Sequence, residues 1–371
     1  MVSGCTTISV DATDLGLLAI SGCVERSAPA DAGPVVPERL LLYTGGQLSS
    51  PYLAKTAHGV LRFCPERVVA VVDDAHAGRR VPDVLPWGPD VPVVVPRDDL
   101  GDLAEPGTGL AVGLAPGGGR FSDDQRGFLI GVARRGMVVV NGLHEVLPGD
   151  NVVNLRAARP DDRGLPAGTH FRATRILTVG TSGGIGKMTT TILLQQALLA
   201  RGVRADWVAT GQTGVIIRGT GRVIDSVVVD FVSGVVERLV AAHDRGYDVL
   251  VVEGQGSLFH PAYAPSTIAL LHGSRPEGTV LCHRLGQDRH RDYDQALLDV
   301  VDAARAHQAV TDALGLACVL VGVSLDSSPV SRVAYERARD RISTELGVAC
   351  CDPVRESAAC LAEAVVGVLP R

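Results

Sequence analysis

The sequence predicts an α/β protein of two domains, each built on a parallel sheet that helices cover on both faces. Three observations predict this fold class. With 371 residues, the chain exceeds what one hydrophobic core usually supports. Near-continuous Val and Leu runs alternate with helical segments along most of its length. A segment rich in Pro, Gly and charge, residues 158–170, separates two such series and is predicted to be the interdomain linker.

The first series predicts a Rossmann-like domain over residues 37–160, after an N-terminal extension. The extension, residues 1–36, lacks firm periodicity and is interpreted as one or two short strands with a Pro/Ala linker. Gly45 and Gly46 follow the first strand without a GxGxxG pattern, so an NAD-dependent role is the weaker interpretation. Asp73, after the second strand, either receives a ribose hydroxyl or caps a loop. Strands are expected at residues 39–46, 67–74, 91–95, 109–116 and 137–143, and a helix at 54–64.

The second series predicts a doubly wound, P-loop NTPase-like parallel sheet over residues 170–371. Ligands of such open sheets bind at the carboxyl ends of the strands, so the loops that follow the strands are searched for site residues. Strands are expected at residues 175–180, 204–211, 222–230, 248–254, 278–284 and 315–325. Helices are expected to begin at Lys187, Phe231, Asp292 and Ser328, with one more near residues 265–271.

Composition excludes several classes of partner. The net charge of −6 and the pI near 5.9 argue against a nucleic acid or a membrane surface, since both need a basic face. The apolar residues 15–24 are too short to span a bilayer and follow acidic residues, so neither a membrane span nor a signal peptide is predicted. The eight cysteines form no CxxC pair, which favours reduced thiols in a cytoplasmic protein. A small anionic ligand remains.

One glycine-rich turn carries the strongest functional signal. It joins a buried strand to a helix, and its glycines can aim successive N–H groups at one anion, next to the positive end of the helix dipole. Lysine adds a mobile cation. Phosphate binding is the favoured interpretation, and a purely structural turn is the alternative. The residues expected to bind the phosphates are Gly180, Thr181, Ser182, Gly183, Gly184, Ile185, Gly186, Lys187, Met188 and Thr189.

Lysine itself is rare in this chain. Lys55 and Lys187 are the two lysines, both beside glycine-rich turns, in a chain that otherwise uses arginine as its cation. An ammonium is a compact point charge that suits one oxygen, whereas a guanidinium is a broad fork. Both lysines are therefore site candidates, although chance also accounts for Lys55.

The turn resembles that of dethiobiotin synthetases, which are ATP-dependent enzymes of this fold. Five residues separate Gly180 from the Gly-Lys pair, and the later segment "DVLVVEGQGS" matches that family's strand with an acidic residue beside magnesium, here Glu253. Two positions depart from that family: Ser182 replaces its loop aspartate, and Met188 replaces the hydroxyl residue after the lysine. A thioether is a poor magnesium ligand, so no metal ligand is predicted. A diphosphate without a transferable γ-phosphoryl group, such as that of coenzyme A, suits this loop.

A closer resemblance covers nearly the whole chain. It is carried by residues 54–79, by "GTSGGIGKMTT", by "ATGQTGVII" and by residues 260–287. These segments are similar to a long-uncharacterised family with a Rossmann-like N-terminal domain and a P-loop C-terminal domain. Its members are described as N-acetyltransferases that use acetyl-CoA and D-glutamate. The resemblance implies an acyltransferase of amino-acid metabolism, with acetyl-CoA or another acyl-CoA as donor and a small amino acid as substrate.

Acyl transfer to an amine needs a proton acceptor and donors for the developing oxyanion. His260, on the loop that leaves the strand of Glu253, is the first candidate for proton acceptor; His283 is another. Each histidine also fits a structural role, and Glu253 fits a buried cap. Short polar groups and cations that follow strand ends are the candidates for substrate binding, with solvated side chains as the alternative. They are Thr210, Gln212, Thr213, Arg284 and Lys55.

Three hypotheses remain open from the sequence. The first is the acyl-CoA-dependent N-acyltransferase. The second is an ATP-dependent amide-forming ligase with Mg²⁺, as the likeness to dethiobiotin synthetases suggests. The third is a nucleotide-sensing module without catalysis. A homo-oligomer is expected only because sites between domains or protomers are common.

Overall fold

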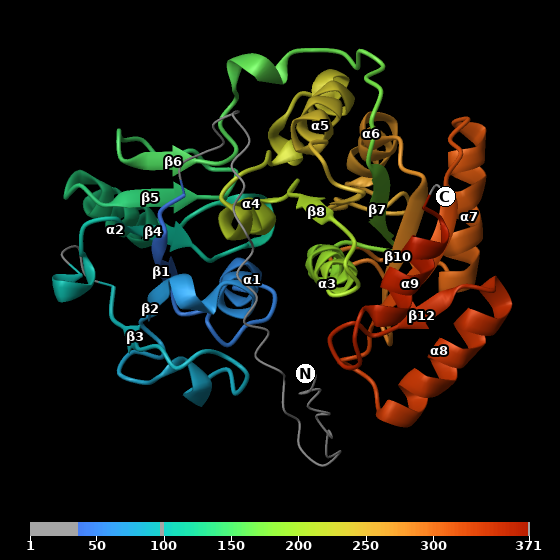
Figure 1. The fold of residues 1–371 in the computed structure, drawn as a ribbon. Coiled ribbons are helices and arrows are strands. Elements are labelled where there is room, and N and C mark those ends of the chain that lie inside the picture. The colour runs from blue at the N-terminus through green and yellow to red at the C-terminus, as the bar shows by residue number, and fades with distance from the viewer. Residues whose placement is uncertain (1–35, 97–99, 370–371) are drawn as a thin grey trace, which may run out of the picture.

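Two parallel six-stranded sheets form the frame of the protein (Figure 1). The computed structural model describes residues 36–96 and 100–369, so the predicted strands of the N-terminal extension lie almost wholly outside the described residues. The strand orders are β3-β2-β1-β4-β5-β6 and β12-β11-β10-β7-β9-β8. Each strand pairs in parallel with its sheet neighbours, as the near-continuous apolar runs predicted. The predicted α/β fold class is therefore confirmed.

The elements alternate along the chain. The strands are β1 Arg39–Tyr43, β2 Val68–Val72, β3 Val93–Val94, β4 Thr108–Val112, β5 Val138–Asn141, β6 Val152–Asn154, β7 Thr174–Gly180, β8 Ala205–Val208, β9 Val249–Val252, β10 Gly278–Arg284, β11 Val319–Asp326 and β12 Ala349–Cys351. The helices are α1 Lys55–Phe63, α2 Asp123–Arg134, α3 Lys187–Leu199, α4 Gln212–Arg218, α5 Val229–His243, α6 Ala264–Ser274, α7 Val300–Ala313, α8 Arg332–Leu346 and α9 Ala359–Gly367.

Two predicted elements were wrong. Residues 222–230 do not form a strand: a short 3-10 turn, Ile224–Ser226, leads into α5. The apolar run that suggested a strand ends in Val228 and Val229, which are both 63% exposed, because the segment crosses the surface instead of joining the sheet. Its first residue, Arg222, is buried and paired with Asp162 of the linker. A tertiary ion pair therefore fixes the path that local propensity misassigned.

The helix predicted from Asp292 is also wrong. Asp292 has a φ of +63°, and the backbone folds back on itself there, with Leu297 N donating to Asp288 O at 2.8 Å. The helix α7 begins at Val300 instead, where Asp299 caps it by accepting from Val301 N. The irregular segment 285–299 lies against the glycine-rich loop, and this contact outweighs its helical periodicity.

The two domains share one core. Leu42 and Val60 of the first domain belong to the same buried cluster as Trp207 and Ile216 of the second. In Figure 1, α1 and α4 lie between the two sheets and face each other. Arg67 spans this boundary, donating to the carbonyls of Ile216 and Ile217 at 2.9 and 3.1 Å. The relative position of the domains is thus set by buried apolar and charged contacts together.

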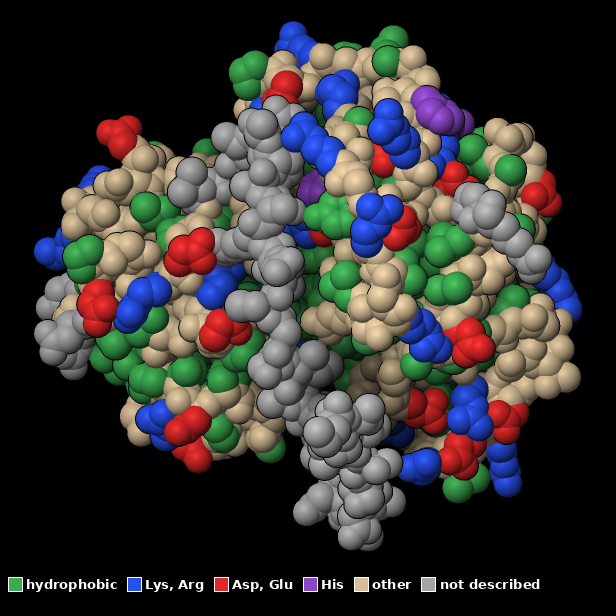
Figure 2. All heavy atoms as spheres, viewed as in Figure 1, with side chains coloured by type: hydrophobic (Ala, Val, Ile, Leu, Met, Phe, Trp, Pro, Cys, Tyr) green, Lys and Arg blue, Asp and Glu red, His purple; other side chains and the backbone are tan. Residues whose placement is uncertain are grey.

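The surface carries both signs of charge. On the face in Figure 2, Lys and Arg side chains alternate with Asp and Glu over both domains. Within the described residues, we find no helix with the length and hydropathy needed to cross a membrane.

Candidate active site at the domain boundary

The glycine-rich loop follows β7, the strand between β10 and β9, and leads into α3. Gly184 and Gly186 have φ values of +66° and +98°, which favour glycine because a Cβ would be strained there. A Cβ placed on Gly180 would lie 2.8 Å from Ile185 Cδ1 and 3.2 Å from Lys187 Nζ, so this glycine makes room for the ammonium. The result is a cradle of backbone N–H groups at the start of α3.

The side chain of Lys187 folds back under the glycine-rich loop and bonds to its backbone. This side chain is buried, and Nζ donates to Ser182 O at 2.8 Å. Burial is the main cause that lowers the pKa of Lys187 to about 8; the positive charge of Lys55 contributes, while Cys282 and Glu253 oppose the shift. An ammonium held at such a site is electrostatically unsatisfied and gains from an anion in the loop.

Two neutral histidines hold the hydroxyl groups of the loop. His283 Nδ1 lies 3.0 Å from Thr181 Oγ1, and His290 Nδ1 lies 3.1 Å from Ser182 Oγ. Burial lowers the pKa of His283 to about 4 and also lowers that of His290. His283, a predicted catalytic residue, therefore orients the loop and is poorly suited to accept a proton. His290 was not predicted; the signal that would have found it is a second histidine on the loop leaving the strand of His283.

His260 lies over the loop from the other side. Its ring is stacked on Tyr263, and its Cδ2 atom lies 3.9 Å from where a Cβ on Gly183 would be. His260 Nδ1 accepts from Ala262 N at 3.2 Å, and burial lowers the pKa of the ring. The neutral ring therefore carries its proton on Nε2. This tautomer favours hydrogen-bond donation, rather than the proton acceptance that the sequence suggested.

Glu253 is buried at the end of β9 and is held by three donors. Thr210 N and Gly211 N donate to Oε2 at 2.9 and 3.1 Å, and Gln255 Nε2 donates to Oε1 at 3.1 Å. Burial nevertheless raises the pKa of Glu253 to about 7, and the three donors and Lys187 only partly offset it. Glu253 thus anchors the turn between β8 and α4 and also changes charge near neutral pH.

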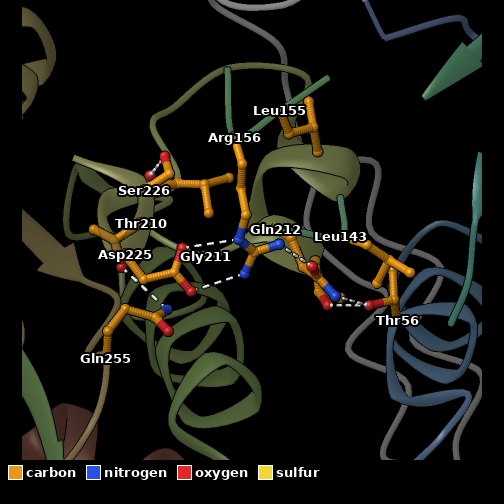
Figure 3. A network of polar contacts seen from close by, with 12 residues as sticks. Thr56, Leu143, Leu155, Arg156, Thr210, Gly211, Gln212, Asp225, Ser226 and Gln255 are labelled. Carbon is orange, nitrogen blue, oxygen red and sulfur yellow. Dashed lines mark hydrogen bonds and ion pairs between the residues drawn. The ribbon is translucent and has the colours of Figure 1, made fainter. Parts of the chain in front are cut away.

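Polar side chains from both domains meet at the boundary (Figure 3). Arg156, just after β6, makes two hydrogen bonds to Asp225 at 3.0 and 2.8 Å and one to Gln212 Oε1 at 2.5 Å. Gln212 Nε2 in turn donates to Thr56 Oγ1 at 2.8 Å, and that oxygen also lies 3.0 Å from Thr213 Oγ1. Of the predicted substrate residues, Gln212 and Thr213 are therefore engaged in joining the domains.

A cavity of about 390 Å³ opens over the loop. It contains Gly183 and Gly184 at its base, and Tyr52 of the first domain forms part of its wall. Three arginines line it. Arg284 pairs with Asp326 at 3.2 Å and Arg289 with Asp294 at 2.8 Å, whereas the Arg291 guanidinium lies 3.8 Å from the centre of the Tyr52 ring. The cavity therefore suits an anionic ligand that extends beyond the loop.

The residues at the loop do not fit a magnesium site. A Cβ on Gly59 of α1 would lie 3.2 Å from Met188 Cε, so the side chain after the loop lysine packs into the domain boundary. The hydroxyl of Ser182 is bonded to His290, and Glu253 is already bonded to three N–H groups. Hard cations need several free oxygen ligands, which this set does not supply. Among the described residues, no group of three or more His, Cys, Asp or Glu side chains is arranged to hold a metal.

Asp73 of the first domain does not present a free carboxylate. Thr44 Oγ1 and Leu48 N donate to Oδ2 at 2.6 and 3.0 Å, while the backbone N and Nδ1 of His76 contact Oδ1 at 3.0 and 2.8 Å. The carboxylate thus fixes the loop after β1, as in the capping alternative. This occupancy weakens the dinucleotide interpretation of the first domain.

Both domains match domains of known protein families. Residues 161–362 match the P-loop domain of the domain of unknown function DUF1611, and residues 74–163 match the Rossmann-like domain DUF1611_N. A crystal structure of a DUF1611 family protein from Anabaena variabilis superposes with a TM-score of 0.81 at 32% identity, covering 89% of this chain and 99% of that one.

Two relatives share the name D-glutamate N-acetyltransferase. The protein from Pseudoalteromonas sp is 33% identical over 260 residues, covering 67% of this chain and 78% of the relative. The protein from Tritonibacter scottomollicae is 32% identical over 276 residues, covering 70% and 81%. These matches confirm the two-domain resemblance that the sequence motifs predicted.

Proposed function

The chain belongs to the DUF1611 family, and on that premise we propose that it is an N-acyltransferase. It transfers the acetyl group of acetyl-CoA, or a related acyl group, to the amine of D-glutamate or a similar small amino acid. The names of the two relatives support the reaction class. The observation that carries the donor is the loop itself, a closed cradle with a buried ammonium below an arginine-lined cavity.

The loop fits a diphosphate that needs no divalent ion. Backbone N–H groups and Lys187 supply positive charge at the base, and arginines supply it at the mouth. Met188 has no oxygen to offer and Ser182 Oγ is already bonded to His290, so neither position supplies a ligand to the magnesium that ATP chemistry ordinarily uses. The diphosphate of CoA is chemically inert in acyl transfer, so the loop only has to hold it.

In the transfer step, the neutral amine attacks the thioester carbonyl. The C–N bond forms and the C–S bond breaks, so the CoA thiolate leaves and takes up a proton, while the amine loses one. We assign Glu253 as the proton acceptor because it follows β9 directly, near the loop lysine, and burial raises its pKa to about 7. His260, with its proton on Nε2, donates to the developing oxyanion. Both roles require the pantetheine arm to fold back toward the loop, because the thioester and the diphosphate are at opposite ends of CoA.

Titration calorimetry with acetyl-CoA, and with ATP in the presence and absence of Mg²⁺, tests the donor. We expect acetyl-CoA to bind without Mg²⁺ and D-glutamate to be acetylated with release of free thiol. Binding of ATP only with Mg²⁺, together with ADP release, would instead favour an amide-forming ligase. Nucleotide binding with no turnover of any amino acid would favour a sensing module.

A further inference from the structure

Lys55 forms no ion pair with any residue that the structure describes. It begins α1 of the first domain, and within the described residues its ammonium makes no hydrogen bond or ion pair. The side chain is open to solvent, yet protein atoms surround it closely enough for desolvation to lower its pKa. Arg156 and Arg291 also lower this pKa, while the carboxylate of Asp225 opposes the shift. Lysine is rare in this chain, and packing alone does not explain why one lies beside two arginines.

Arg291 is a second cation for which the described residues provide no ion-pair partner. The other arginines of this region have carboxylate partners: Arg156 pairs with Asp225, Arg284 with Asp326 and Arg289 with Asp294. In the part of the chain that the structure describes, Arg291 makes neither an ion pair nor a hydrogen bond, and its guanidinium is stacked on Tyr52. Its planar face is fixed while its N–H groups remain available.

The two cations come from opposite domains, and Arg291 lies close enough to Lys55 to lower its pKa. The Arg291 guanidinium is stacked on the ring of Tyr52, which lies three residues before Lys55 in the chain. Both Tyr52 and Arg291 line the cavity that also contains Gly183 and Gly184. The fold therefore brings two mutually repelling charges together beside the loop. An anion between them removes the repulsion, and neither domain can bind that anion alone.

We propose that Lys55 and Arg291 bind the 3′-phosphate on the ribose of the CoA donor, an assignment that rests on the proposed function. The 3′-phosphate is attached to the same nucleotide as the diphosphate, so it must lie close to the loop in any conformation of the arm. The acceptor's carboxylates, in contrast, are tied to the thioester end. The Tyr52–Arg291 stack also offers a flat surface for the adenine ring.

The test compares acetyl-CoA with acetyl-dephospho-CoA, which lacks only the 3′-phosphate. The wild-type enzyme should prefer acetyl-CoA by roughly ten- to hundredfold in kcat/KM, the range of a charged contact. Lys55→Met and Arg291→Met should each reduce that preference, because each should lower kcat/KM for acetyl-CoA by a larger factor than kcat/KM for the dephospho form. Arg289→Met is the matched control, since Arg289 lines the same cavity but is paired; it should keep the preference.

Two outcomes would overturn the assignment. If the wild-type enzyme uses both donors equally well, Lys55 and Arg291 do not bind the 3′-phosphate. If Lys55→Met raises the KM for D-glutamate and leaves the donor preference intact, Lys55 binds a carboxylate of the acceptor instead. If the wild-type protein acetylates nothing, the proposed function fails, and calorimetry with adenosine 3′,5′-bisphosphate against AMP, which lacks only the 3′-phosphate, still decides whether the pair selects a 3′-phosphate.

Discussion

Replacing Lys187 with methionine separates a binding role from a structural one. The lowering of the Lys187 pKa from 10.5 to about 8 means that keeping its ammonium charged in the folded protein is unfavourable by on the order of 3 kcal/mol at neutral pH. Methionine has a similar length and no charge, so this penalty disappears. Against this gain, Ser182 O loses its buried donor, which costs about 1–3 kcal/mol.

The two effects nearly cancel, so Lys187→Met should leave the unfolding free energy of the ligand-free protein unchanged or raise it by up to about 2 kcal/mol at pH 7. Donor affinity should nevertheless fall by about 1.5–3 kcal/mol, or roughly ten- to 150-fold, because a charged contact to phosphate is lost. Since the folded pKa lies below the unfolded one, the penalty in the wild type is complete below about pH 8 and vanishes above pH 10.5. Any stability advantage of the variant should shrink over that window.

Urea unfolding at pH 7, 8 and 10 and calorimetry with acetyl-CoA measure the two effects. Lys55→Met is the matched control for stability, because that lysine is exposed and makes no hydrogen bond in the described structure. A fall of more than about 3 kcal/mol in unfolding free energy, with donor affinity unchanged, would refute the reasoning and make Lys187 a structural residue.

Three other changes test neighbouring groups. In the wild type, deprotonation of Glu253 should make kcat/KM rise through about pH 7, and Glu253→Gln should abolish this rise. The variant should also be more stable than the wild type above pH 7 without ligand, since a raised folded pKa contributes stability that is lost as pH rises through it. If the pH profile of kcat/KM is the same in the variant, Glu253 is not the base. His260→Gln, which keeps an N–H donor, should retain more activity than His260→Ala in steady-state assays, and equal rates would argue against donation. Gly59→Ala places a methyl group 2.5 Å from Thr213 Cγ2, so overpacking of about 1–3 kcal/mol should outweigh the helix gain of up to about 1 kcal/mol, and Thr213→Ser should rescue it in urea unfolding.

The sequence predicted the sheets well because their signal is local. Val-rich runs buried on both faces identify parallel strands without knowledge of their neighbours. It failed at residues 222–230 and at the helix from Asp292, where long-range contacts decide the backbone. Arg222 pairs with Asp162 across the linker, and His290 reaches Ser182 of the loop. Such contacts join residues 60 and 108 positions apart, so no window of local periodicity contains them.

The glycine-rich loop was predictable for a different reason. Positive φ angles favour glycine at Gly184 and Gly186, and a lysine directly after such glycines is typical of a phosphate-binding loop. The groups around the loop carry weaker signals, because a histidine or glutamate serves equally as a cap or a catalyst. The structure adds the surroundings of each group: burial lowers the pKa of His283 to about 4 and raises that of Glu253 to about 7, and His260 Nδ1 accepts from Ala262 N.

Met188 links the unusual loop to the two-domain architecture. In an isolated P-loop domain the residue after the lysine is free to contact a metal, but here its methyl group packs against Gly59 of the other domain. The position is therefore committed to the domain boundary, and positive charge for the phosphates has to come from side chains. The first domain supplies Lys55 next to that contact and fixes Arg291 through Tyr52. If the loop binds a diphosphate as proposed, the Rossmann-like domain takes the place of a metal ion by adding positive charge beside the loop.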